Sequence, residues 1–405
     1  FVDLCKAHGR SIALAELYAK PTLPAWQSLW DRAEKATQGR SINGDSPRLW
    51  QGEAFELSLV QQAYWHGRKS GQHLGGVACQ VYLEIACPSL ETAVLQNALD
   101  ALIKRHELLR MRVTAENKGL ILPFQPSSLE AYDVRHLNAQ DFAQHRHTLR
   151  ARLHDLVLDL ANVSGFQLIA SHGSQATLLY INIDMVIADA LSIQILLHEF
   201  SLAVFAPTHE FVPLQYSFPQ YLIEQKAGEN STKSQAYWAQ RLKSALPLAP
   251  DLVLAQPAPR MEKPVFIHRQ WRLQNEQWLI LTSSAQGAGV TPSMLLANCF
   301  AETIRGWASV PEFCINLTIF NRRGQHPELA KLVADFTSLL LLACHTEAGA
   351  SMVENARSLN RQFMQDLDHV DYSAIQVLRD WSHSSGQQMT MPVVFTSNLG
   401  RDLGS

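Results

Sequence analysis

Leu178-Leu179-Tyr180-Ile181-Asn182-Ile183-Asp184-Met185-Val186-Ile187-Ala188-Asp189 is an apolar stretch interrupted by two acids. The residues that follow, 190–204, place apolar side chains at helical spacing. The pattern predicts a strand that ends at Asp184, a tight corner, and a helix that begins at or near Asp189. An aspartate at a helix N-terminus can accept hydrogen bonds from backbone N–H groups and interact with the positive end of the helix dipole.

The two aspartates need partners, because burying an ionised carboxylate without a cation or a hydrogen-bond donor is costly. Corners of this kind can carry catalytic groups, and they also use aspartate simply to shape the chain. On the residues alone a structural role is favoured, since corner aspartates commonly cap helices or pair with arginine.

The composition is that of a globular protein. The chain has 405 residues, 47% hydrophobic and 18% charged, with a formal net charge of -3. That length allows two cores, because single cores stop growing at roughly 250–300 residues. The near-neutral charge argues against nucleic-acid binding, and no apolar stretch reaches the roughly 18–20 residues of a membrane span. Six cysteines without a C-x-x-C pair indicate free thiols in the cytoplasm, and no residue cluster indicates a metal site.

The chain divides into four parts by composition and pattern. Residues 1–30 form a short helical piece, residues 31–50 a polar linker, and residues 51–215 and 216–405 two mixed α/β halves. We expect strands at 77–85, 108–113, 166–170, 178–184, 266–273, 313–320, 337–344 and 393–397, and helices at 59–65, 91–105, 141–158, 190–204, 221–242, 277–285 and 292–307. Two lobes with a cleft between them would place a small-molecule site in that cleft.

Two further polar clusters interrupt apolar strands in the second half. Thr318 lies within the expected strand 313–320, and Asn321 follows at its end with a pair of arginines. Asp335 precedes the very apolar strand 337–344, where burial could raise its pKa and make it a proton shuttle near neutral pH. From the residues alone, ordinary structural roles stay open for both clusters.

Taken in order, these segments resemble the heterocyclization (Cy) domains of nonribosomal peptide synthetases, which are relatives of condensation domains. The resemblance covers about residues 50–400. The matching segments are 55–68, Arg105-His106-x-x-Leu109-Arg110, Asp184 to Asp189, Ala236-Tyr237-Trp238, 246–250, Thr291-Pro292-Ser293, Ala334-Asp335-Phe336-Thr337 and 392–397. The aspartate doublet matches a D-x-x-x-x-D motif that replaces the H-H-x-x-x-D-G motif of ordinary condensation domains.

The resemblance implies an α/β (α+β) fold of two lobes like chloramphenicol acetyltransferase, arranged as a V-shaped pseudodimer around a tunnel. Residues 1–30 resemble the C-terminal end of a carrier protein, without the Gly-Gly-x-Ser that bears phosphopantetheine. The chain ends before the last strand and helix of the family, so we expect an incomplete C-terminal lobe.

The resemblance also implies an activity. Cy domains join an upstream carrier-bound acyl thioester to carrier-bound Cys, Ser or Thr and cyclise the product to a thiazoline or oxazoline. The resemblance implies that Asp335 is the acid/base and that Thr318 and Asn321 orient the intermediate. Asp184 and Asp189 are expected to be mainly structural and to pair with an arginine beside the tunnel.

The expected partners are the upstream and downstream carrier domains and the adjacent adenylation domain of the same synthetase. The expected pathway is siderophore biosynthesis. No cofactor is expected in the domain itself, because substrates arrive on phosphopantetheine arms. We also expect the domain to be cytoplasmic and monomeric, without contact to nucleic acid or membrane. Two alternatives stay open. One is an ordinary condensation domain, which would carry a His-His pair where Ile183-Asp184 stands; the other is a non-catalytic carrier-docking domain.

Overall fold

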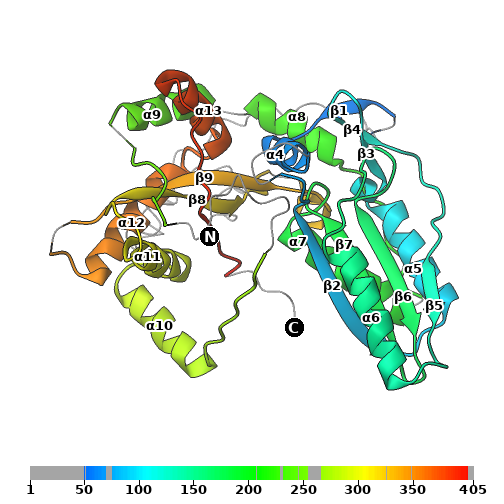
Figure 1. The fold of residues 1–405 in the computed structure, drawn as a ribbon. Coiled ribbons are helices and arrows are strands. Elements are labelled where there is room, and N and C mark those ends of the chain that lie inside the picture. The colour runs from blue at the N-terminus through cyan, green and yellow to red at the C-terminus, as the bar shows by residue number, and fades with distance from the viewer. Residues whose placement is uncertain are drawn as a thin grey trace.

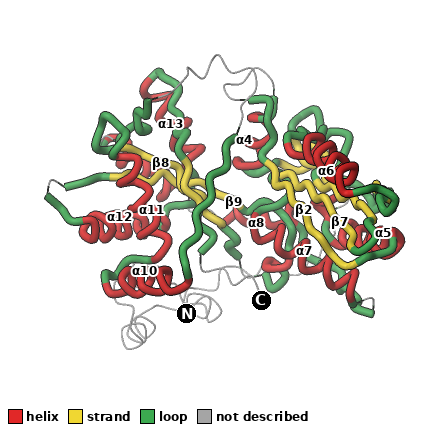
Figure 2. The backbone as a smooth tube through the Cα atoms, turned by 60° about the horizontal axis from the view of Figure 1, so that its bottom comes forward, coloured by secondary structure: helices red, strands yellow, loops and turns green. Residues whose placement is uncertain are grey.

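The structure, a computed structural model, describes residues 50, 52–69, 75–206, 208–228, 231–244, 246–253, 266–324, 326–347 and 349–399. The carrier fragment expected at 1–30 and nearly all of the linker expected at 31–50 lie outside these residues. The described residues form two lobes that lie side by side (Figure 1). In Figure 2 the strands of the two lobes form two separate groups, each flanked by helices.

The first lobe is built on a four-stranded sheet. Its strand order is β2 (Gln80–Pro88), β7 (Ala176–Asp184), β6 (Phe166–His172) and β5 (Glu130–Asp133). β7 pairs antiparallel with both of its neighbours, and β5 pairs parallel with β6. The lobe's other elements are β1 (Ala54–Glu56), β3 (Met111–Val113), β4 (Lys118–Ile121), α4 (Leu59–Gly67), α5 (Thr92–Arg105), the 3-10 helix η1 (Glu107–Arg110), α6 (Ala139–His154), α7 (Ala190–Phe205) and α8 (Phe218–Gly228).

The central strand β7 is buried on both faces because its alternate side chains enter two different cores. Tyr180 packs with Leu149 and Leu153 of α6, whereas Leu179 and Ile181 belong to the main core of the lobe. Successive side chains of a strand point to opposite faces, so α6 covers one face of the sheet and the main core the other. A strand covered on both faces is apolar almost throughout, which is the pattern that residues 178–183 show.

The second lobe has a three-stranded sheet of order β10 (Val394–Thr396), β8 (Phe313–Phe320) and β9 (Thr337–Cys344). β8 pairs antiparallel with β9 and parallel with β10. Its helices are α9 (Ser231–Lys243), α10 (Asn275–Gly287), α11 (Pro292–Arg305), α12 (Met352–Leu367) and α13 (Ala374–Ser385). These elements share one core, which is separate from the core of the first lobe.

Side-chain caps fix where several helices begin. The Ser58 hydroxyl accepts from the backbone of Gln61, whose side chain accepts from the backbone of Ser58, forming a capping box at the start of α4. Thr291 caps α11, with Pro292 at its first position, where the missing N–H has no helical partner to lose. No helix within the described ranges is long and apolar enough to cross a membrane.

β8 and β9 have the bounds that the sequence pattern predicts, and three other expectations are wrong or incomplete. The strand expected at 108–113 is instead η1 followed by the short β3. The consecutive residues Leu108 and Leu109 both pack into the main core of the first lobe, whereas consecutive side chains of a strand point to opposite faces. Residues 266–273 form no strand: Trp271 and its neighbours are exposed and pair with no strand among the described residues. The helix expected at 221–242 corresponds to parts of α8 and α9, and α12 and α13 were not predicted.

The segment between β8 and β9 crosses into the first lobe. It contains a short 3-10 helix, η3 (Leu329–Lys331), and its residues Val333, Ala334 and Phe336 belong to the core of the first lobe. Asp335 therefore does not stand apart in the second lobe, as its place in the chain suggests. It lies where the two lobes meet, close to the corner that follows β7.

Candidate active site

Asp184 is held by an arginine at the end of α4. One carboxylate oxygen, Oδ1, lies 2.8 Å from Nη2 of Arg68 and 3.0 Å from the backbone nitrogen of Val186, which donates to it. The side chains of Asp184 and Arg68 are both almost fully buried. A buried pair of this kind keeps its geometry because either partner alone would be an uncompensated charge. The pair fixes the turn that follows β7.

Asp189 is the N-cap of α7 and also ties the two lobes together. Its Oδ1 accepts from the backbone nitrogen of Ser192 at 2.8 Å and from Nη2 of Arg322 at 2.9 Å. The Ser192 hydroxyl donates to the carbonyl oxygen of Ala334 at 2.8 Å, and the Ala334 nitrogen donates back to that hydroxyl at 3.0 Å. Arg322 and Ala334 come from the second half of the chain. The helix cap is thus the point at which the crossing segment is attached to the first lobe.

Asp335 lies next to this junction with its carboxyl group buried. Its side chain is 1% exposed, and Oδ1 accepts from the backbone nitrogen of Thr337 at 3.0 Å. The other oxygen, Oδ2, is buried without a hydrogen-bond partner among the described residues. The pKa of Asp335 is raised to about 8, mainly by burial. The hydrogen bonds from Thr337 and the charge of Arg322 oppose this rise, and the charge of Asp189 adds to it. A carboxyl group with this pKa exchanges protons near neutral pH.

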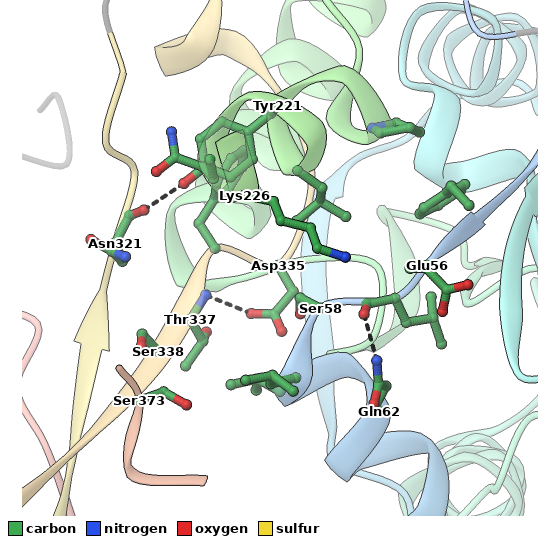
Figure 3. A pocket seen from close by; sticks show the side chains of 18 of the residues that line it. Glu56, Ser58, Gln62, Tyr221, Lys226, Asn321, Asp335, Thr337, Ser338 and Ser373 are labelled. Carbon is green, nitrogen blue, oxygen red and sulfur yellow. Dashed lines mark hydrogen bonds between the residues drawn. The ribbon is translucent and has the colours of Figure 1, made fainter. Parts of the chain in front are cut away.

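Asp335 faces a cavity of about 750 Å³ between the lobes. Figure 3 shows Asp335 between the start of α4, where Ser58 lies, and the strand that begins at Thr337. Tyr221 of α8 closes the cavity from another side, and its hydroxyl donates to the carbonyl oxygen of Asn321 at 2.9 Å. Its size is within the roughly 300–1,000 Å³ typical of ligand sites, so the cavity can hold a small-molecule substrate beside Asp335.

Thr318 and Asn321 lie at the end of β8, around a second cavity of about 340 Å³. The hydroxyl of Thr318 accepts from that of Thr396 at 2.8 Å. Asn321 lines both cavities, and its Oδ1 is buried without a hydrogen-bond partner among the described residues. The structure therefore brings Asn321 and Asp335 to one cavity and places Thr318 in the adjoining one.

The sequence interpretation missed three residues of this arrangement. Arg68 is the last residue of the matching segment 55–68, but no partner was assigned to it. Tyr221 was placed only within an expected helix. Ser192 had a local signal, because a hydroxyl three residues after an N-cap aspartate is placed to interact with it. Within the described ranges no group of three potential ligands could hold a metal ion, and the five cysteines there are unpaired.

Sequence comparisons identify relatives over most of the chain. The family described as Condensation domain matches residues 51–401. The chain is 32% identical over 402 residues to pyochelin synthetase PchE of Pseudomonas aeruginosa, covering 98% of the chain and 28% of that protein. It is 31% identical over 402 residues to phenyloxazoline synthase MbtB of Mycobacterium tuberculosis, covering 97% of the chain and 28% of that protein. The chain thus spans little more than a quarter of either relative.

Solved structures share the two-lobed fold. The cyclization-docking bidomain of the EpoB nonribosomal peptide synthetase from Sorangium cellulosum has a TM-score of 0.79 and 27% identity; the match covers 86% of this chain and 72% of that one. The X-domain from teicoplanin biosynthesis is similar in fold, with a TM-score of 0.69 at 16% identity over 86% of this chain and 77% of that one. The mixed α/β architecture expected from the sequence is confirmed.

Proposed function

This chain belongs to the condensation-domain family of nonribosomal peptide synthetases, and from that premise we propose that it is a heterocyclization domain. The proposal extends to the chain what the printed names of its relatives say of them, namely a phenyloxazoline synthase and a cyclization domain. It also draws on pyochelin synthetase in placing the chain in siderophore biosynthesis.

The proposed reaction has two steps. In the first, the amine of a carrier-bound Cys, Ser or Thr attacks the carbonyl carbon of an upstream acyl thioester; a C–N bond forms, the C–S bond breaks, and the carrier thiol leaves with the proton. In the second, the side-chain thiol or hydroxyl adds to the new amide carbon. The former carbonyl oxygen leaves as water, the nitrogen loses its proton, and a C=N bond completes the five-membered ring.

The single observation that carries this proposal is the buried carboxyl group of Asp335, which faces the larger cavity with a pKa of about 8. Ring closure needs a base for the thiol or hydroxyl proton and an acid for the departing oxygen. One group can serve in both roles only if its two protonation states are both accessible near neutral pH. Amide formation from a thioester is downhill and needs mainly positioning of the reactants, so it makes no such demand.

Thr318 and Asn321, the hydrogen-bonding groups at the end of β8, orient the tetrahedral intermediate. The Thr318 hydroxyl accepts from Thr396, so its own hydrogen is free to donate to the oxygen of the tetrahedral intermediate. The Oδ1 of Asn321, which has no hydrogen-bond partner within the described ranges, can accept from the intermediate's N–H or O–H. Donors and acceptors placed where charge develops lower the barrier most when water is excluded.

The proposal includes the partners that this reaction needs. An upstream and a downstream carrier domain deliver the two substrates on phosphopantetheine arms, and an adenylation domain of the same polypeptide loads one of them. The domain itself would bind no cofactor. An ordinary condensation domain is less well supported. With its aspartate at Asp189, the H-H-x-x-x-D-G motif places the two histidines at 184 and 185 rather than at 183 and 184, and this chain has Asp184 and Met185 there.

The test is reconstitution with loaded carriers, comparing the natural chain with Asp335→Asn. We expect the variant to form the amide and to stall before ring closure, so that mass spectrometry of the tethered product shows no loss of water. Glu276→Gln, at an exposed carboxyl group in the first turn of α10, is the matched control and should cyclise normally. Normal ring formation by Asp335→Asn would refute the assignment of Asp335 as the acid/base.

A further inference from the structure

Two helices begin at the larger cavity, each with a serine. Ser58 precedes α4 and Ser373 precedes α13, and both serines line the cavity that Asp335 faces. Figure 3 shows the three side chains at this cavity. Each serine is followed three residues later by a glutamine, Gln61 or Gln376. The same short sequence pattern therefore starts both helices.

The two serine hydroxyls are used differently. The Ser58 hydroxyl accepts from the backbone nitrogen of Gln61 at 3.1 Å, as an N-cap does. At α13 the backbone nitrogen of Gln376 donates to the carbonyl oxygen of Ser373 at 2.9 Å. The hydroxyl oxygen of Ser373 has no hydrogen-bond partner among the described residues, although Ser373 is only 7% exposed. The start of α13 thus does not depend on this hydroxyl.

A buried hydroxyl without a partner at a cavity wall indicates a missing ligand atom. Leaving a buried donor unsatisfied is costly, and nearly all such groups in folded proteins are bonded. The hydroxyl hydrogen of Ser373 can be donated. It lies at the N-terminus of a 12-residue helix, where the free backbone N–H groups and the helix dipole favour an electron-rich atom. This part of the cavity therefore favours a ligand oxygen that accepts a hydrogen bond.

Other donors on the cavity wall are engaged or exposed. The side-chain nitrogens of Gln62 and Gln225 each donate to a backbone carbonyl oxygen at 2.8 Å. Lys226 is exposed on α8, where water solvates its ammonium group. Because the Ser373 hydroxyl is buried, a ligand oxygen that binds it replaces no hydrogen bond within the described part of the protein.

The proposed reaction contains one carbonyl group that neither step changes. The carrier-bound amino acid must bring its amine and its side-chain thiol or hydroxyl into the larger cavity, where Asp335 exchanges protons with them. Its own thioester carbonyl is separated from the amine nitrogen by a single carbon atom, so it enters the same cavity. A fixed donor on that carbonyl oxygen would hold the amine and the ring-closing group in place.

We propose that the Ser373 hydroxyl donates to the thioester carbonyl oxygen of the carrier-bound amino acid and so positions this substrate for both steps. This inference rests on the proposed function and adds a substrate-binding residue to it. Ser373 belongs to the second lobe, whereas the residues on either side of Asp335 pack in the core of the first. The acceptor substrate is then held by both lobes.

The test compares two acceptors at a saturating concentration of acetyl-pantetheine as donor. One is cysteinyl-pantetheine, and the other has a CH₂ group in place of the thioester carbonyl. Rates are measured at the amide step. We expect the natural chain to show a KM for the thioester that is lower by about two- to tenfold, the effect of one hydrogen bond. Ser373→Ala should lose this difference while its kcat and its KM for the donor stay unchanged.

Ser384→Ala, at an exposed position in the same helix, is the matched control and should keep the difference. If Ser373→Ala discriminated between the acceptors as the natural chain does, the assignment would be overturned. A rise in the KM of the donor alone would also overturn it.

A second measurement asks whether the Ser373 hydroxyl only caps its helix. Ser58→Ala removes a hydroxyl that caps α4 and should lower the midpoint of guanidinium denaturation. Ser373→Ala removes a hydroxyl without a partner among the described residues and should leave the midpoint nearly unchanged. An equal fall in the two variants would mean that Ser373 is a helix cap, against the proposal.

The outcomes separate this inference from the proposed function. Amide products with the expected change in KM but without loss of water would uphold the role of Ser373 and refute cyclization. Loss of water with no effect of Ser373→Ala on KM would uphold cyclization and refute the role of Ser373.

Discussion

Replacing Asp335 by asparagine is expected to stabilise the protein above neutral pH while it removes ring closure. Asparagine is close in shape to a protonated aspartic acid. Its Oδ1 can keep the 3.0 Å hydrogen bond from the Thr337 nitrogen, and its amide nitrogen takes the place of Oδ2, which has no hydrogen-bond partner in the described part of the chain. The variant therefore loses the acid/base group without losing packing.

The magnitude follows from the pKa of Asp335, which burial raises from 3.8 to about 8 in the folded chain. Between these pH values the folded state holds a proton that the unfolded state has released, so stability falls as pH rises. The contribution is fully present below the unfolded pKa and is lost as pH rises to the folded pKa. Applying the linkage relation from pH 5 to pH 9 gives a loss of about 4 kcal/mol in the free energy of unfolding.

The assay is guanidinium denaturation of the natural chain and of Asp335→Asn at pH 5, 6, 7, 8 and 9, a range of about two units on each side of neutrality. The difference in free energy of unfolding between the two proteins isolates this group from all others that titrate. It should grow by about 4 kcal/mol in favour of the variant over that range. Glu276→Gln is the control for replacing a carboxyl group elsewhere in the chain. A flat difference for Asp335→Asn would mean that Asp335 does not titrate in this range, and the proposed acid/base role would fail with it.

Three further predictions concern the site and its supports. Arg322→Ala should destabilise the protein by about 3–5 kcal/mol, because it leaves the buried Asp189 without its cation; chemical denaturation measures this, and a loss below about 1 kcal/mol, typical of a surface pair, would contradict it. Gly119→Ala should cost about 1–3 kcal/mol, since a Cβ there would lie 2.3 Å from the ring of Phe55. Phe55→Leu in the same chain should recover part of that loss, and no recovery would show that the ring is not the obstacle. The pH profile of ring closure should show an apparent pKa near 8 from Asp335, obtained from single-turnover rates; a rate independent of pH between about 6 and 9 would exclude it.

Local pattern predicted the elements that neighbours in the chain determine. The bounds of β8 and β9 follow from mainly apolar segments, and the corner after β7 follows from acids placed between a strand pattern and a helix pattern. The sequence pattern gave a wrong prediction where residues with a strand pattern are not buried. Residues 266–273 have the side chains of a strand but find no neighbouring strand among the described residues, and strand-forming side chains stabilise a strand only when they pack.

The candidate site could be predicted only in part. Asp335, Thr318 and Asn321 were proposed from their motifs, but the structure alone shows that Asn321 joins two cavities and that Thr318 lies in the second. The arginine partner of Asp184 was expected without being identified. Arg68 is 116 residues away from it in the chain, and no periodicity in a sequence reports on a contact of that range.

By itself the sequence determined the family, the order of the strands and helices around the aspartate doublet, and the chemical identity of the groups available for proton transfer. The tertiary structure decided what those groups can do. It carried the segment before β9 into the core of the first lobe, joined Arg322 to Asp189 across 133 residues, and buried Asp335 to 1% exposure. The pKa of a carboxyl group depends on its solvation and on the charges around it, and both arise only when distant parts of the chain pack together.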